Sequence, residues 1–170
     1  LAEILGMAAG YSESIFYASA MHDIGNISVP GSILLKPGRL TPEERAVVEG
    51  HTTAGAEILS SLAGSPFLAM GAEIAATHHE CWDGTGYPAR LSGDRIPLSA
   101  RIVLLCDRYD ALRSKRPYKP PLSHEAATAI IVQGDGRSEP GQFDPEVLNV
   151  FRRHNGRFAE IFDAPEVLKS

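Results

Sequence analysis

Apolar residues recur every three to four positions along most of the chain, the spacing of an α-helix with one buried face. Sustained alternation of apolar and polar residues, which marks a half-buried strand, is not seen. The pattern predicts helices over residues 12–22, 41–62, 66–81 and 99–114, and two more that begin at Ser123 and at Asp144. We therefore expect an all-α fold, a single helical domain with long ordered loops.

The helix predicted over 41–62 has the clearest start. Thr41 and Glu44 form a T-x-x-E capping box, and Pro42 occupies the first helical position, where its missing N–H costs nothing. Before it, residues 24–40 hold three glycines and two prolines and are expected to form an ordered loop. The apolar stripe predicted for this helix consists of Val47, Val48, Ala54, Ile58 and Leu62.

The composition fits one soluble domain. Of the 170 residues, 44% are hydrophobic and 22% are charged, and no apolar run approaches the length of a membrane span. Cys81 and Cys106 are the only cysteines, so we expect two free thiols in a reducing, cytoplasmic compartment. The formal net charge of −5 argues against binding to DNA or to a membrane surface through a broad basic face.

Positive charge is nevertheless concentrated in one segment. Residues 108–119, RYDALRSKRPYK, carry Asp110 as their single acidic residue. Such a cationic strip on an acidic protein suits a small anionic ligand. Its basic residues are Arg108, Arg113, Lys115, Arg116 and Lys119.

Several polar residues occupy positions that helical spacing assigns to the core. His51 lies in the apolar stripe of its predicted helix, and His78 and His79 follow small and apolar residues at helical spacing. Asp107 takes a core position in the helix predicted over 99–114. Burying a lone carboxylate is costly unless it is paired or binds a cation. These side chains therefore need partners within the fold.

His22 and Asp23 add a further imidazole and carboxylate at the end of the first predicted helix. One histidine on an apolar face is usually a core residue satisfied by the backbone, but several such sites are best explained by shared metal coordination. Imidazole and carboxylate ligands suit iron, manganese, nickel or zinc better than calcium or magnesium. The candidate ligands are His22, Asp23, His51, His78, His79 and Asp107.

The spacing of these ligands predicts two ions. Adjacent residues such as His78 and His79 point about 100° apart on a helix, so we expect each pair to serve two neighbouring ions. The Asp23 carboxylate could bridge them, because it has two oxygens. Two metals about 3.5 to 4 Å apart are used in the hydrolysis of phosphoesters.

The motifs resemble those of the HD-GYP family, a branch of the HD-type metal phosphohydrolases. The resemblance covers most of the chain in order, and the string HHE-x-x-DG-x-GYP is highly specific. The matching elements are HDIGN at 22–26, VPGSILLKPGRLTPEE at 29–44, His51, HHECWDGTGYP at 78–88, IP at 96–97, ARIVLLCDRYDAL at 100–112, RPYK at 116–119 and FDPEV at 143–147.

The resemblance implies a helical domain over residues 1–170 that hydrolyses the bacterial second messenger cyclic di-GMP, through pGpG toward GMP. It implies a centre of two or three iron or manganese ions, held by the six candidate ligands. Tyr87 would stack a guanine, while Arg116 and Lys119 would hold the phosphates and act in catalysis with Asp23. An arginine can bind a phosphate through two hydrogen bonds, which agrees with this role.

Structural interpretations of the same residues are also open. Arg116 alone could be a solvated surface charge, and Tyr87 could be structural. For Trp82 we favour a hydrophobic plug beneath the loop that carries GYP.

The sequence departs from the family pattern at Asn26, where HDIGK has a lysine. An asparagine can donate a hydrogen bond but carries no charge, so weaker binding or slower turnover is expected. The family also carries glutamate and histidine ligands upstream of the position of Leu1, so we expect a domain truncated at its N-terminus, with a receiver or sensory domain before it.

Two alternatives to the hydrolysis of cyclic di-GMP are open, and the first of them follows from these departures. One is a catalytically weak or inactive module that binds the dinucleotide or a signalling partner, such as a receiver domain or a diguanylate cyclase. The other is an HD phosphohydrolase that acts on a different nucleotide.

Overall fold

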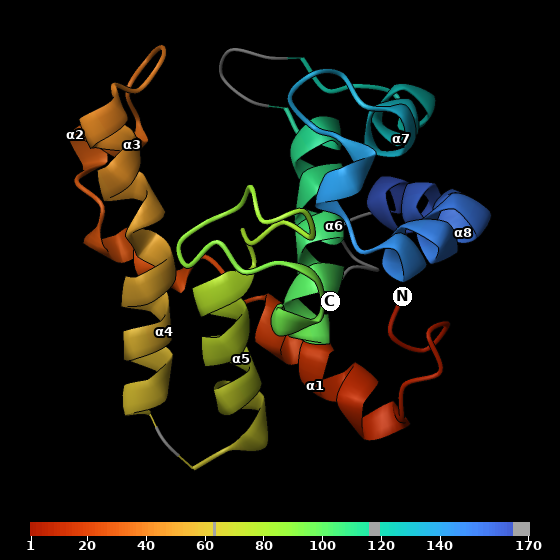
Figure 1. Cartoon of the computed structure of the whole chain (residues 1–170), viewed down its shortest axis with the longest axis horizontal. Helices are drawn as coiled ribbons and strands as arrows, with labels where there is room; N and C mark the ends of the chain where they lie inside the picture. The colour runs from red at the N-terminus through yellow and green to blue at the C-terminus, as the bar shows by residue number, and fades with distance from the viewer. Residues whose placement is uncertain (63, 116–119, 165–170) are drawn as a thin grey trace.

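The structure, a computed structural model, describes residues 1–62, 64–115 and 120–164, and within these ranges it contains no strand. The expected all-α class is confirmed (Figure 1). The helices are α1 (Ala9–Ser19), α2 (Gly31–Leu34), α3 (Pro42–Glu49), α4 (His51–Ser61), α5 (Pro66–Thr77), α6 (Leu98–Arg113), α7 (His124–Gln133) and α8 (Pro145–Asp163), with the 3-10 turns η1 (Ile24–Ser28), η2 (Gly93–Arg95) and η3 (Pro140–Gln142).

Helix α6 stands between two groups of helices (Figure 1). On one side α4 packs along α5, and α5 also contacts α1. On the other side α7 and α8 pack against α6 and against each other. The core that joins them includes Ile74, Leu105, Ile131 and Phe151, all fully buried. The apolar face of α6 is thus covered from both sides, which explains its long run of buried residues.

The helix starts predicted at Thr41, Ser123 and Asp144 are confirmed, whereas the first helix begins at Ala9 and not at residue 12. In the capping box of α3 the Thr41 amide donates to the Glu44 carboxylate at 2.8 Å, and the Glu44 amide donates to the Thr41 hydroxyl at 3.3 Å. Ser123 caps α7, and the Asp144 carboxylate accepts from the first amides of α8. These caps satisfy backbone donors that have no partner inside the helix.

The single helix predicted over 41–62 is wrong, because α3 ends at Glu49 and α4 begins at His51. The predicted stripe is also wrong at its ends, where Val47 is 44% and Leu62 is 56% exposed. The face that packs against η1 and α5 is instead His51, Thr52, Gly55 and Leu59. Gly55 on this face allows a close approach of the neighbouring segments, since a Cβ there would lie 3.2 Å from the Gly25 amide nitrogen and 3.3 Å from the Ala75 Cβ.

The helices predicted over 12–22 and 66–81 end earlier than expected, at Ser19 and Thr77. After α1, the amide of His22 donates to the carbonyl of Ser19, three residues back. After α5, the amide of Glu80 donates to the carbonyl of Thr77 in the same way. These tighter turns carry the candidate ligand pairs beyond the helix ends.

Two further sequence expectations concern the whole chain. Cys81 and Cys106 are both free, as expected, and burial raises the pKa of the Cys106 thiol to about 11. Within the described residues, no helix is both long enough and apolar enough to cross a membrane.

Candidate metal centre

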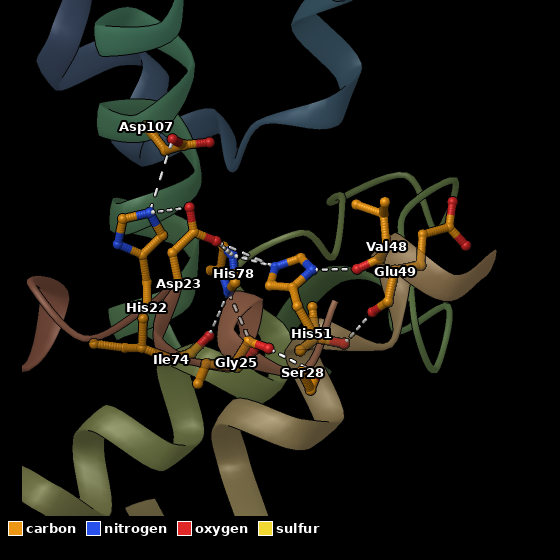
Figure 2. A network of polar contacts seen from close by, with 12 residues as sticks. His22, Asp23, Gly25, Ser28, Val48, Glu49, His51, Ile74, His78 and Asp107 are labelled. Carbon is orange, nitrogen blue, oxygen red and sulfur yellow. Dashed lines mark hydrogen bonds and ion pairs between the residues drawn. The ribbon is translucent and has the colours of Figure 1, made fainter. Parts of the chain in front are cut away.

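The candidate ligands come from four segments that meet at the junction of α1, α4, α5 and α6. His22 and Asp23 follow α1, and His51 is the first residue of α4. His78 and His79 follow α5, and Asp107 projects from α6. Figure 2 shows the side chains of His22, Asp23, His51, His78 and Asp107 directed toward one another.

Asp23 lies at the middle of this group. Its Oδ1 is 3.3 Å from Nε2 of His51 and 3.7 Å from Nε2 of His78. Its Oδ2 is 3.5 Å from Nε2 of His22. The Oδ1 of Asp107 lies 3.9 Å from the same His22 nitrogen. The two oxygens of Asp23 therefore face different sets of imidazoles (Figure 2).

Four of the candidates form one compact cluster. Asp23, His51, His78 and His79 each offer one ligand atom, and these atoms lie within 4.8 Å of one another. The rings of His78 and His79 are only 4.0 Å apart between centroids. The expectation that these two residues point about 100° apart is wrong, because they lie past the end of α5, where helical spacing no longer applies.

Backbone carbonyls fix the orientation of three of the imidazoles. Nδ1 of His22 lies 2.8 Å from the Ser19 carbonyl, and Nδ1 of His51 lies 2.6 Å from the Val48 carbonyl. Nδ1 of His78 lies 3.0 Å from the Ile74 carbonyl. A carbonyl can only accept, so Nδ1 carries the proton in each ring. Nε2 of His51 and of His78 donates to Asp23 in the metal-free protein, and would present its lone pair to a bound metal ion, the arrangement found in histidine ligands of metals.

The ionisation of the cluster fits cation binding. Hydrogen bonds from His51 and His78 hold the pKa of the Asp23 carboxyl well below its usual range. Burial, together with the neighbouring His78 and His51, lowers the pKa of His79 to about 2. Burial also acts to lower the pKa of His51, but the hydrogen bonds to Asp23 and to the Val48 carbonyl outweigh it and raise the pKa. The charged carboxylate of Asp23 and the neutral imidazole of His79 are the forms that bind metal, whereas His51 would have to release a proton to do so.

Close backbone contact holds the first two ligand segments together. A Cβ at Gly25, in η1, would collide with the His51 carbonyl and with the Gly55 amide nitrogen. Only glycine allows η1 to lie this close to α4. The contact fixes Asp23 relative to His51, because Asp23 lies two residues before Gly25.

Glu80 fixes the loop after the two histidines, a role that the sequence did not reveal. Its side chain is buried, and its two carboxylate oxygens accept from the amides of Ala89 at 2.7 Å and Leu91 at 2.9 Å. Gly86 lies so close to the turn at His79 that a Cβ there would collide with its backbone. The loop is therefore held against the cluster.

Tyr87 is presented beside the cluster by this loop. Its ring lies 4.8 Å from the His79 ring between centroids, at an interplanar angle of 30°. Burial raises the pKa of its hydroxyl, so the ring stays neutral. Tyr87 also lines a cleft of about 410 Å³ between the loop and the α3–α4 junction. Trp82 is partly buried, with the Arg101 guanidinium over its ring at 5.2 Å.

The remaining predicted site residues are Asn26, Arg116 and Lys119. Asn26 lies in η1, three residues after Asp23. Arg116 and Lys119 lie outside the described residues.

Comparisons with known proteins place this site in a family. The model of the HD domain matches residues 1–147. A cyclic di-GMP phosphodiesterase of Vibrio cholerae is 47% identical over 91% of the chain and 32% of its own length. One of Thermotoga maritima is 44% identical over 95% of the chain and 43% of its own length. A 3'3'-cGAMP-specific phosphodiesterase 2 of Vibrio cholerae is 40% identical over 95% of the chain and 30% of its own length.

The chain thus spans less than half of the length of these relatives. The match nevertheless includes every candidate ligand, since all six lie within residues 1–147. Its histidine and aspartate cluster suits a divalent metal ion. The chain belongs to the HD domain family, in its HD-GYP branch.

Proposed function

We propose that the chain is a metal-dependent phosphodiesterase that hydrolyses cyclic di-GMP. The observation that carries the proposal is the convergence of imidazole nitrogens and carboxylate oxygens beside the Tyr87 ring. The names of the relatives from Vibrio cholerae and Thermotoga maritima support the substrate. An aromatic ring next to a cationic centre suits a ligand that joins a base to a phosphodiester.

The ligand set divides into two parts. Asp23, His51, His78 and His79 would hold one ion. His22 and Asp107, with the second oxygen of Asp23, lie beside it and would hold another. Iron or manganese is the proposed identity, with nickel and zinc as alternatives. Bound ions of this kind polarise phosphoryl oxygens and lower the pKa of water.

The other residues position the substrate. Tyr87 stacks one guanine, held in place by the loop that Glu80 secures. Asn26 donates a hydrogen bond to a phosphate oxygen, without the charge of a lysine. Arg116 and Lys119 are proposed to bind the phosphates on sequence grounds alone. Asp23 keeps the ligand imidazoles aligned, through the contacts of its two oxygens.

Hydrolysis of cyclic di-GMP by anaerobically purified protein, loaded with manganese or iron, tests the proposal. Product analysis by chromatography would separate pGpG from GMP. We expect Asp23→Ala to lower turnover more than about a hundredfold, since even partners outside the ligand shell change activity by 10- to 100-fold. Equal turnover in the variant would reject the mechanism.

Asn26 favours a second candidate, a module that binds the dinucleotide but hydrolyses it slowly. Calorimetry that shows tight binding without product after long incubation would support it. Asn26→Lys should then raise turnover. A substrate panel with 3'3'-cGAMP tests a third candidate, because one of the relatives is named for that substrate.

The remaining proposals concern the whole protein. Residues 1–170 would form one catalytic domain that works in the bacterial cytoplasm. A receiver or sensory domain upstream, or a diguanylate cyclase as partner, would control it. Comparison of turnover with and without phosphorylation of such a receiver would test this control.

A further inference from the structure

The cleft beside Tyr87 has two walls of different origin. One wall is the junction of α3 and α4, which contributes Glu49 and Thr53. The other is the loop after the histidines, which contributes Tyr87 and Arg90. Its volume of about 410 Å³ lies within the range of small-molecule sites, about 300 to 1,000 Å³. Tyr87 connects the cleft to the metal centre, because its ring lines the cleft and also lies 4.8 Å from the ring of His79.

The two walls carry opposite charges that face the same space. Over the described part of the chain, no hydrogen bond or ion pair engages the Glu49 carboxylate or the Arg90 guanidinium. Figure 2 shows the Glu49 side chain pointing away from the imidazole cluster, so it is not placed to bind the same ions. After burial, the Glu49 charge is the next cause of the raised pKa of Tyr87, which agrees with its position near the ring.

The backbone of Arg90 is strained. Its φ of 52° lies in the left-handed region, and it is the only residue other than glycine to do so in the described structure. A side chain with a Cβ is disfavoured in this conformation, whereas glycine adopts it freely. Backbone strain at a residue that lines a cleft indicates that its side chain has a functional role there, such as ligand binding.

The two charged groups match the edges of guanine. An arginine fork donates to O6 and N7 of guanine, the commonest specific contact with this base. A carboxylate on the other wall accepts from the N1–H and the amino group of the same base. Adenine has a lone pair at N1, which would face the carboxylate, and an amino group at position 6, which would face the guanidinium. Neither charged group would then find a matching hydrogen-bond partner at that atom.

We propose that Glu49 and Arg90 form a guanine-selective base site, in which Tyr87 stacks the base while the two charged side chains bind its edges. This inference rests on the proposed function, because it assigns the base specificity of the same substrate site. A matched hydrogen-bond pair discriminates between bases by about 1–3 kcal/mol, which is about 5- to 150-fold. Selectivity for guanine over adenine should thus depend on both residues.

The test compares kcat/KM for cyclic di-GMP and cyclic di-AMP in the metal-loaded protein. Glu49→Gln and Arg90→Gly should each lower the ratio of the two values by about tenfold or more. Arg90→Lys keeps the charge but loses the fork, so it should lower the ratio as well. Glu57→Gln, on an exposed position of α4, and Arg39→Gly, in an exposed loop, are the matched controls and should leave the ratio unchanged.

Thermal unfolding separates this role from a structural one. Arg90→Gly should keep or raise the melting temperature, because glycine relieves the left-handed strain, while the selectivity falls. An unchanged ratio in both Glu49→Gln and Arg90→Gly would overturn the inference and leave the proposed function standing.

If the wild-type protein hydrolyses neither dinucleotide, the proposed function fails, and binding of GMP and AMP decides on the base site. Tighter binding of GMP that is lost in Glu49→Gln and Arg90→Gly would support it. Equal binding of the two nucleotides by the wild-type protein would overturn it.

Discussion

Glu80 shows how one buried side chain positions a site that it does not enter. It follows the two histidines directly, yet its partners are the amides of Ala89 and Leu91, nine and eleven residues further along. A carboxylate that accepts two backbone hydrogen bonds offsets the cost of its own burial. Glu80 thereby holds the loop that carries Tyr87 beyond the tyrosine itself.

Glu80→Gln should therefore destabilise the fold. The amide keeps one acceptor oxygen but turns an N–H donor toward a backbone donor, without changing the volume of the side chain. We expect a loss of about 1–3 kcal/mol in the free energy of unfolding, measured by urea denaturation. Glu57→Gln, at an exposed position, should change it by less than about 0.5 kcal/mol. A similar small change for Glu80→Gln would show that the loop does not depend on the carboxylate.

His79 should make the metal-free protein sensitive to mild acid. Its pKa is lowered to about 2 in the folded state, mainly by burial, so the unfolded chain binds a proton that the folded protein excludes. Stability is then lost as the pH falls below the unfolded pKa of about 6.5, by about 1.4 kcal/mol per pH unit.

The shifts of His51 and Asp23 act outside this window. The raised pKa of His51 gives stability that is complete below pH 6.5 and is lost at higher pH. The lowered pKa of Asp23 gives stability that is lost only below about pH 4. Urea denaturation between pH 6.5 and 5 thus reports on His79. His79→Asn should make the free energy of unfolding depend less on pH in this range. An unchanged pH dependence in the variant would show that His79 is not the group responsible.

The position of the candidate ligands in space could be predicted from the sequence, but the support of the site could not. His51, His78 and Asp107 stand out because they are polar at apolar positions, and the structure brings them together with His22 and Asp23. Their role as ligands stays a prediction. The role of Glu80 could not be predicted, because its partners are backbone amides. Nearly every residue has a backbone amide, so the sequence does not indicate which ones a carboxylate will bind.

At the scale of elements, the helix starts with a capping side chain were predictable, but the start of α1 at Ala9 and the ends of α1 and α5 were not. The side chains of Thr41, Ser123 and Asp144 cap their helices, and these residue types can be recognised in the sequence. No glycine or proline marks the ends of α1 and α5 at Ser19 and Thr77. These helices end where hydrogen bonds to the third residue back replace the helical bonds to the fourth residue back. Tertiary packing determines where this change occurs.

The contact between η1 and α4 yields a prediction at this scale. Gly25→Ala would drive a Cβ into the backbone at His51 and Gly55, which cannot move as a side chain end can. We expect a loss of about 1–3 kcal/mol or more in stability, together with weaker manganese binding, because His51 and Asp23 shift apart. Thermal unfolding and metal titration would measure the two effects.

Gly10→Ala provides the matched control for this prediction. Gly10 lies within α1, and a Cβ there meets no atom within 4 Å. Alanine should stabilise this helix by roughly 0.5–1 kcal/mol and leave metal binding unchanged. Equal effects of the two substitutions would show that the contact between η1 and α4 has no role in placing the ligands.

At the scale of the whole molecule, the centre joins parts of the chain that are far apart in sequence. Its ligands come from α4, from α6 and from the turns after α1 and α5, whereas α7 and α8 pack on the other side of α6. Cations bound there would cross-link four separate segments of the folded chain. Because the unfolded chain does not hold these groups together, binding should stabilise the fold.

Metal loading should accordingly raise the melting temperature. At a free manganese concentration of 100 times the dissociation constant, the gain is about 2.7 kcal/mol, which corresponds to roughly 5–10 °C for a chain of this size. Asp23→Asn should abolish most of this shift, because Asp23 contacts both sets of imidazoles. Asp107→Asn should reduce it less, since Asp107 lies beside His22 and outside the compact cluster. Calcium should give a smaller shift than manganese, because imidazole is a poor ligand for it. Equal shifts for the wild-type protein and Asp23→Asn would mean that manganese binds elsewhere, and the centre as described would then have no part in holding the four segments together.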